Sequence, residues 1–213
     1  MAVRVKTKDD FPLGQEAPRS QTALRYTASG PEHRNDMQIF PSSFSTPLGG
    51  NPFDEEGIRF TGMLELAQSA GELRLNSNGP HEQRFINYRN LEHPKDRERL
   101  RERVRIIEDM TEHESFNVIV EKLISPVEAG LASDDTLDQW LLENVWIGQH
   151  LSGTCKMGSD SDEIAVVDQY GRVGGIQELR VAGAFIMPDC IRANTNCTTI
   201  MIGDRVANRM INQ

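Results

Sequence analysis

The 213-residue sequence lacks a hydrophobic run long enough to cross a membrane, since no apolar stretch approaches the roughly 18 residues that a span needs. Residues 1–6 also lack the apolar segment of a secretory signal, so a cytoplasmic location is expected. Cysteine is scarce, and Cys155, Cys190 and Cys197 are too scattered for a disulfide framework. No pair of them has zinc-motif spacing, so no metal site is expected.

Positive charge is also in short supply. Lys and Arg number 23 against 32 Asp and Glu, which gives a formal net charge of −9. This excess of negative charge argues against nucleic acid or an anionic membrane as a partner. The hydrophobic fraction of 38% fits one ordinary globular domain, or two small ones that share a core.

Two patterns that would define a class of enzyme are absent. No G-x-G-x-x-G unit for binding a dinucleotide is present, and residues 171–175 are too short to replace it, so they predict a hairpin turn. No G-x-S-x-G segment is present either, which argues against a hydrolase with a Ser–His–Asp triad.

The first eighty-odd residues predict mostly antiparallel β structure. Alternating apolar and polar residues indicate strands at 23–27, 37–40, 62–67 and 71–75. The connection between the last two has the length of a hairpin.

Residues 96–110 change to a helical period. Leu100, Val104 and Ile107 share one face, and Asp96 is placed to cap the helix. The other positions are nearly all charged. A solvated helix face is favoured over a binding surface for them.

Three more helices and a strand are expected further along the chain. The helices cover residues 116–123, 133 to about 145, and 200–210, and the strand covers 179–184. Ser133 is the expected cap of the second helix, whose inward side chains are Leu137, Trp140, Leu141 and Val145.

The residues that could carry chemistry gather in the last 64 positions. They are H-L-S-G-T-C-K-M-G at 150–158, L-R-V-A-G-A-F-I-M-P at 179–188, and N-T-N at 194–196 before the last helix. Each piece alone is weak, because a single histidine is more often structural and asparagine is a common turn residue. The sequence N-C-T at 196–198 matches a glycosylation site, but no secretory signal supports its use.

Together these segments resemble the C-terminal half of the glucose–methanol–choline (GMC) flavin oxidoreductases. That family's pattern is H-P-x-G-T-C-x-M-G, then L-R-V-x-D-A-S-x-M-P, then N-x-N before a helix. Residues 85–88 and 133–137 are similar to its substrate domain. The resemblance implies an α+β fold, in which residues 1–149 form a substrate-binding domain with an antiparallel sheet flanked by helices. Residues 150–213 would return to complete an FAD-binding α/β domain.

The resemblance also implies roles for particular residues. His150 would be the catalytic base, and Asn194 would donate to the substrate oxygen. The FAD contacts that it implies are Gly183, Ala184, Asn196, Cys197 and Thr198. Three positions depart from the pattern: Leu151 replaces proline, Gly183 replaces an aspartate near the cofactor pyrophosphate, and Phe185 replaces serine.

The activity implied is FAD-dependent oxidation of a small alcohol by hydride transfer. A histidine can take the hydroxyl proton, and an amide can donate to the same oxygen. The dinucleotide-binding half would have to come from a separate chain or a missing segment, and without it an apolar patch over 181–186 and 200–202 would be exposed. The alternative is a non-catalytic half-protein that binds a partner.

Overall fold

The computed structural model describes residues 1–11, 18–30, 33–44, 57–192 and 194–212. The chain forms two compact units. The first comprises Met1–Glu72 and Tyr88–Trp146, and the second comprises Leu73–Asn87 and Ile147–Gln213. The functional boundary expected between residues 149 and 150 stays a prediction. No helix among the described residues is long and apolar enough to span a membrane.

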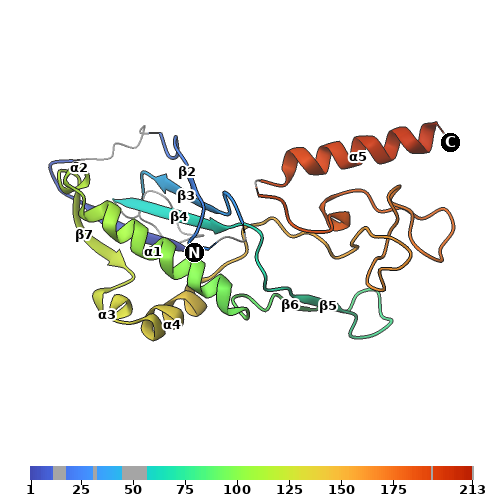
Figure 1. The fold of residues 1–213 in the computed structure, drawn as a ribbon, viewed down its shortest axis with the longest axis horizontal. Coiled ribbons are helices and arrows are strands. Elements are labelled where there is room, and N and C mark those ends of the chain that lie inside the picture. Colours follow the sequence, from blue (N-terminus) through green and yellow to red (C-terminus); the bar gives the residue numbers. More distant parts are fainter. Residues whose placement is uncertain (12–17, 31–32, 45–56, 193, 213) are drawn as a thin grey trace. The chain divides into compact units, whose positions relative to one another are not determined.

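An antiparallel sheet forms one layer of the first unit (Figure 1). Among the described residues its strand order is β2-β3-β4-β1-β7. The strands are β1 (Ala2–Thr7), β2 (Leu24–Tyr26), β3 (Met37–Ser42), β4 (Ile58–Leu64) and β7 (Val120–Ser125). The expected strands at 23–27 and 37–40 are confirmed as β2 and β3.

The strand β1 was not predicted, although it lies between β4 and β7. Its burial alternates, with Val3, Val5 and Thr7 buried and the residues between them half-buried. This is the period-two pattern of a strand with one face on the core. Arg4 and Lys6 alternate with Val3 and Val5, so the sequence itself carries the strand signal in this segment.

Helix α1 (Pro94–Glu112) packs against β4 and carries the core face that the sequence predicts. Leu100, Val104 and Ile107 are all buried. The predicted cap is wrong, however, because the helix begins earlier and His93 is its N-cap, accepting from the backbone N–H of Lys95.

Asp96 instead lies at the centre of a buried ionic network. Its carboxylate accepts from Arg99 at 2.7 Å and from the backbone N–H groups of Gln68 and Ser69 at 3.0 and 2.7 Å. Arg99 also pairs with Asp36 at 3.0 Å. Burial alone would raise the pKa of Asp96, but these hydrogen bonds outweigh it and hold the pKa below its usual value. The expected fully solvated charged face is therefore wrong on this side of α1.

Arg103 is a second buried charge on the same helix. Its side chain is fully buried, and its Nε and both Nη atoms have no hydrogen-bond partner among the described residues. Burial lowers the pKa of its guanidinium to about 10. The group lies directly over Gly62, where an added Cβ would come within 2.0 Å of Nη1 and 2.4 Å of Cδ. Glycine at position 62 is what allows β4 to lie so close to α1.

The segment after α1 differs from the expected helix at 116–123. The chain makes one short helix, α2 (Glu114–Asn117), and then β7, which pairs with β1. The spacing of apolar residues in this segment is also compatible with a helix. Its pairing with β1 is what makes it a strand. After the short α3 (Glu128–Leu131), helix α4 (Asp134–Asn144) is confirmed with its Ser133 cap. Of its predicted inward side chains, Leu137 and Leu141 are fully buried, and Trp140 and Val145 pack partly buried against the core.

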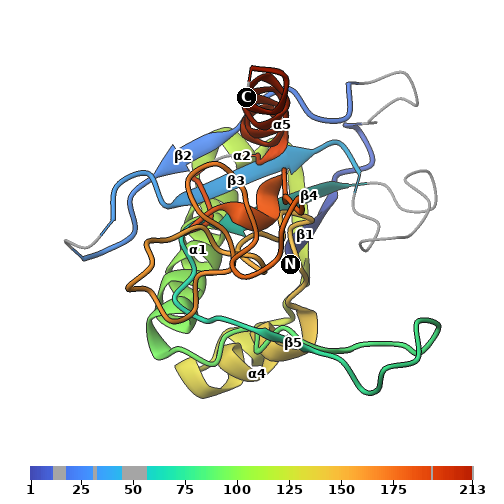
Figure 2. The same cartoon turned by 90° about the vertical axis from the view of Figure 1, so that its right-hand side faces the viewer.

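The second unit contains β5 (Glu72–Arg74), β6 (Phe85–Asn87), the 3-10 helix η1 (Ala184–Ile186) and α5 (Asn196–Ile211). The predicted hairpin between 62–67 and 71–75 is wrong, because β5 pairs with β6 (Figure 2). The predicted strand at 179–184 is also wrong. Only Arg180 makes a bridge there, with Arg172, and the chain then enters η1. The predicted last helix is confirmed as α5 and begins earlier.

The buried network predicts that Asp96→Asn lowers the free energy of unfolding by about 3 kcal/mol at neutral pH, the usual loss when one partner of a buried ion pair is removed. Because the pKa of Asp96 is lowered in the fold, its stabilisation is present above the unfolded value of about 3.9 and is lost as the pH falls through the folded value. The difference between wild type and Asp96→Asn should therefore shrink in acid. Urea unfolding at a series of pH values measures it.

Glu98→Gln is the matched control for this experiment. Glu98 lies on the same helix, and its ion pair with Lys95 is half-exposed. Its removal should leave the urea midpoint unchanged. A midpoint for Asp96→Asn equal to that of Glu98→Gln would show that the network contributes nothing.

The contact of Gly62 with Arg103 predicts that Gly62→Ala destabilises the protein by about 1–3 kcal/mol, as overpacking of a core does. The control is Gly203→Ala in α5, where an added Cβ meets nothing within 4 Å. Alanine favours a helix, so this change should be neutral or stabilise by up to about 1 kcal/mol. Thermal unfolding compares the two, and equal melting temperatures would mean that Arg103 moves aside without loss.

Candidate active site

The segment that begins at His150 runs beside η1 within the second unit. Gly153, Cys155 and Met157 donate their backbone N–H groups to the three successive carbonyls of η1, at 3.3, 2.9 and 2.9 Å. Alternate residues bond because an extended chain points every second N–H group the same way. These bonds align 153–157 with η1, and so fix the chain on the C-terminal side of His150.

Two further contacts hold His150 itself. Its ring Nδ1 lies 3.1 Å from the Oγ1 of Thr195, and its carbonyl accepts a weak hydrogen bond from the Sγ of Cys190 at 3.7 Å. The imidazole is half-buried, so part of it is open to a ligand. The ring and the backbone of His150 are thus bound to two segments that lie at least 40 positions further along the chain.

Asn194 stands directly before Thr195, at the entrance to α5, and is exposed. The structure therefore brings the two predicted catalytic positions to one part of the second unit, with Thr195 as the link between them. No direct hydrogen bond between His150 and Asn194 is found in the described part of the chain. Both polar groups remain available to a third molecule.

The first turn of α5 contains three of the residues expected at the cofactor. Asn196 and Cys197 are exposed, and Thr198 is half-buried. The N-cap residue, Thr195, makes no side-chain capping bond. The first N–H groups of a helix have no partner within it, and the N-terminus carries partial positive charge. This helix end can bind an electron-rich oxygen.

Gly183 and Ala184 lie where η1 begins. Gly183 is buried and has φ 157° and ψ −170°, a conformation that side-chain-bearing residues rarely adopt. An added Cβ would meet only the Cδ2 of Phe185, at 3.8 Å. The backbone conformation is therefore what favours glycine at position 183, because a Cβ there would have room.

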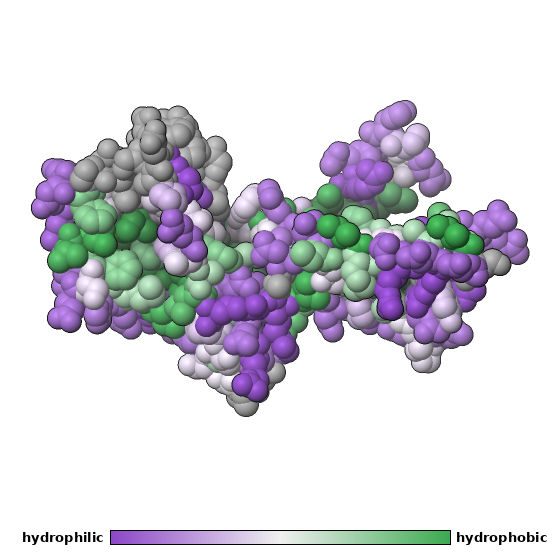
Figure 3. All heavy atoms as spheres, turned by 90° about the horizontal axis from the view of Figure 1, so that it is seen from above, coloured by the Kyte–Doolittle hydropathy of each residue, from purple (hydrophilic) through white to green (hydrophobic). Residues whose placement is uncertain are grey.

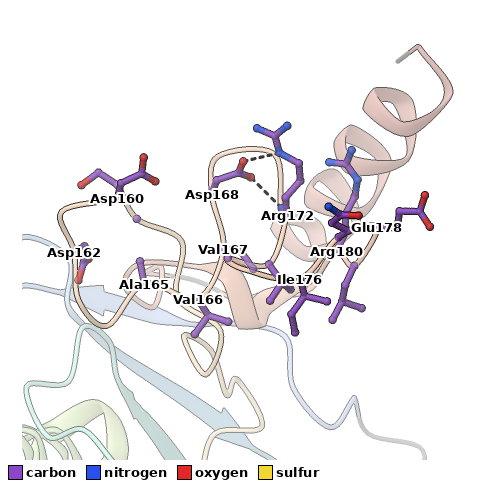
Figure 4. A pocket seen from close by; sticks show the side chains of 16 residues that line it. Asp160, Asp162, Ala165, Val166, Val167, Asp168, Arg172, Ile176, Glu178 and Arg180 are labelled. Atoms are coloured by element: carbon purple, nitrogen blue, oxygen red, sulfur yellow. Dashed lines mark hydrogen bonds and ion pairs between the residues drawn. The ribbon is translucent and has the colours of Figure 1, made fainter.

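A separate open pocket of about 730 Å³ is formed by residues 158–180 (Figure 4). Asp168 accepts there from the backbone N–H groups of Tyr170 and Arg172 and from the Nε of Arg172, at 2.8, 3.0 and 2.7 Å. Val167 and Val173 bridge across this turn, which confirms the predicted hairpin. Among its charged groups Asp168 and Arg172 pair with each other, and none of the predicted catalytic or cofactor residues lines the pocket.

Apolar side chains are exposed on the second unit (Figure 3). Phe185, Ile200 and Met201 are about half-exposed or more, as the expected patch requires. Ile186, the last residue of η1, differs because it is buried. The patch therefore includes only part of the predicted 181–186 segment.

The sequence did not single out Thr195 or Cys190 as contacts of His150. The last helix was expected to begin only at residue 200, so no local pattern assigned a role to Thr195. A thiol near a backbone carbonyl has no sequence pattern at all. Both contacts depend on tertiary structure that joins distant segments.

The sequence model described as GMC oxidoreductase matches residues 67–203. Among curated proteins, the oxygen-dependent choline dehydrogenases of Cronobacter sakazakii and of an Escherichia coli O6:K15:H31 strain are 35% and 36% identical to this chain. The matches cover 76% and 75% of the chain but only 28% of each relative. The chain thus spans little more than a quarter of the length of these proteins.

Two solved structures share the fold. Pyridoxine 4-oxidase from Mesorbium loti superposes with a TM-score of 0.81 at 20% identity, covering 100% of this chain and 42% of that one. A variant formate oxidase of Aspergillus oryzae, in which FAD modification was studied, gives a TM-score of 0.73 at 25% identity and covers 84% of this chain and 32% of its own.

Proposed function

The chain belongs to the GMC oxidoreductase family, and from this membership we propose that it is the C-terminal part of an enzyme that oxidises the CH–OH group of a small alcohol. The observation that carries the proposal is the contact of the His150 ring with Thr195, which brings position 150 next to the entrance of α5. The remaining flavin domain would come from a separate chain or from a segment outside these 213 residues. Choline is the first alcohol to assay, because the relatives above are choline dehydrogenases.

FAD is the cofactor of this family, and the donors present in the second unit fit it. Five residues would hold it: Gly183, Ala184, Asn196, Cys197 and Thr198. The uncapped first turn of α5 offers N–H donors and a positive dipole end, which suit an electron-rich flavin oxygen. Gly183 contributes backbone only, so one contact usual in the family is absent. When bound, FAD would supply the acceptor for the hydride that leaves the alcohol carbon.

His150 would take the proton of the alcohol hydroxyl. As the oxygen loses this proton, its electrons form the C=O bond and the carbon–hydrogen bond breaks. An imidazole can accept a proton near neutral pH, provided that one ring nitrogen carries a free lone pair. His150 is half-buried, with its ring held by Thr195 and its backbone by Cys190, which meets the requirement that a general base be fixed relative to its substrate.

Asn194 would hold the same oxygen while its negative charge develops. A side-chain amide donates without taking the proton, so it does not compete with His150. Its exposure at the entrance to α5 leaves the amide accessible to a substrate.

One observation favours a second candidate function, a non-catalytic subunit that keeps the fold and binds a partner. Gly183 replaces the acidic residue that the family usually has near the cofactor, so flavin binding would lack one side-chain contact at that point. Visible flavin absorbance in the purified complex separates the two candidates. A colourless complex that does not oxidise alcohols would favour the second.

His150→Ala should lower turnover by about two to four orders of magnitude, the usual contribution of a positioned general base. Its flavin content should hardly change, because none of the proposed cofactor contacts is altered. Anaerobic flavin reduction by the alcohol, normalised to bound flavin, measures the effect. A variant that keeps most of its rate would mean that another group is the base.

Asn194→Ala should lose about 2–4 kcal/mol of transition-state stabilisation, as other lost oxyanion donors do. Asn194→His should retain more activity, since a histidine can also donate. If Asn194 is only a turn residue, both variants lose stability but keep the wild-type rate of flavin reduction per bound flavin. That pattern of rates would contradict the catalytic role.

A further inference from the structure

Thr195 is the N-cap of α5, but it does not act as a cap. A capping threonine has an extended backbone and turns its hydroxyl back to the N–H groups of the first turn. Thr195 has φ −72° and ψ −14°, which is helical, and makes no capping bond with its side chain. Its Oγ1 is 3.1 Å from the Nδ1 of His150 instead. The hydroxyl is directed away from the helix and toward the ring.

The surroundings of Thr195 make this contact a fixed one. Thr195 is buried, with a relative exposure of 8%, so water has little access to its hydroxyl. Its carbonyl accepts the backbone N–H of Thr199 at 2.9 Å, which anchors its main chain to α5. On the other side, the bond from Cys190 holds the backbone of His150. His150 and Thr195 are therefore each held by a further hydrogen bond, separate from the contact between them.

We propose that Thr195 is a positioning residue whose hydroxyl accepts a hydrogen bond from Nδ1–H of His150 and thereby fixes the tautomer of the ring. This inference rests on the proposed function, in which His150 is the base. In a neutral imidazole one nitrogen carries the proton and the other the lone pair. With the proton held on Nδ1, the lone pair is on Nε2, where it can accept the proton of the alcohol.

The opposite polarity of this hydrogen bond has the opposite consequence. If the Thr195 hydroxyl donated to Nδ1, the ring proton would be on Nε2, and that nitrogen could not act as a base. A purely structural hydroxyl would leave both tautomers populated. The tautomer of His150 is therefore the property that tests the proposal.

The test compares Thr195→Val with Thr195→Ser. Valine has nearly the same shape as threonine but no hydroxyl, whereas serine keeps the hydroxyl. Nitrogen-15 NMR of histidine-labelled protein in alkaline buffer, where imidazole rings are neutral, reports the tautomer. His150→Ala assigns the signal among the five histidines of the chain. Thr199→Val, one turn further along α5, controls for the effect of valine on the helix.

The wild type and Thr195→Ser should show the Nδ1–H tautomer, and Thr195→Val should lose it. In the flavin-loaded protein, Thr195→Val should lower kcat by about tenfold to a hundredfold, equivalent to one lost buried hydrogen bond, with little change in KM. Thr195→Ser should restore most of this rate. Thr199→Val should match the wild type in both measurements.

Two results would overturn the inference. One is a wild-type tautomer on Nε2, and the other is an unchanged tautomer in Thr195→Val. Neither depends on activity, so they are distinct from failure of the proposed function, which a wild-type rate of flavin reduction in His150→Ala would show. A slow Thr195→Val that Thr195→Ser does not rescue would also contradict the positioning role.

Discussion

The backbone bonds between residues 153–157 and η1 are the constraint on which the candidate site depends. Three N–H groups along an extended segment meet three successive carbonyls, so the two segments have one register. That register places His150 just before the paired stretch, and α5 begins shortly after η1 ends. One short contact, from the His150 ring to Thr195, then joins the polar side chains of the site. Main-chain hydrogen bonds thus fix the backbone from which the side chains of the candidate site extend.

The first unit is stabilised by a different arrangement, in which charged groups lie between a helix and a sheet. Asp96 and Arg99 are buried on α1, where the Asp96 carboxylate accepts from Arg99 and from the backbone N–H groups that follow β4. In the part of the chain that the structure describes, only the Nε of Arg99 has no hydrogen-bond partner within this network. Arg103 lies on the same helix without a hydrogen bond in the described residues, and burial lowers its pKa more than the nearby Tyr26 raises it. The helix is therefore held to the sheet by apolar contacts and by paired ionic groups, beside a buried guanidinium that has no such pairing.

The sequence predicted an element correctly where local signals determine its structure. Helix α4 was predicted correctly because its Ser133 cap and its core face are both local signals. Strand β7 was predicted as a helix, because its partner β1 lies more than a hundred residues away and leaves no trace in the segment itself. The strand expected at 179–184 failed for a different reason, since Leu179 and Val181 bond to the nearby turn at 171–173 and the chain then enters η1.

The candidate site shows the same division. Positions 150 and 194 were found through a family resemblance, which is a pattern of residue types. The role of Thr195 could not be found that way, because the N-x-N pattern leaves the residue between the two asparagines unspecified. Only the helical backbone of Thr195 shows that its hydroxyl is free for another partner.

The close approach of Gly62 to Arg103 also has a consequence for how this protein can evolve. A side chain at position 62 and a full-length arginine at position 103 cannot occupy the same space, so a larger residue at position 62 is unfavourable while position 103 is an arginine. A lineage that shortens residue 103 first would open room for a larger residue at 62, whereas the reverse order passes through a poorly packed intermediate. The two positions, 41 residues apart on different elements, should change together and in that order.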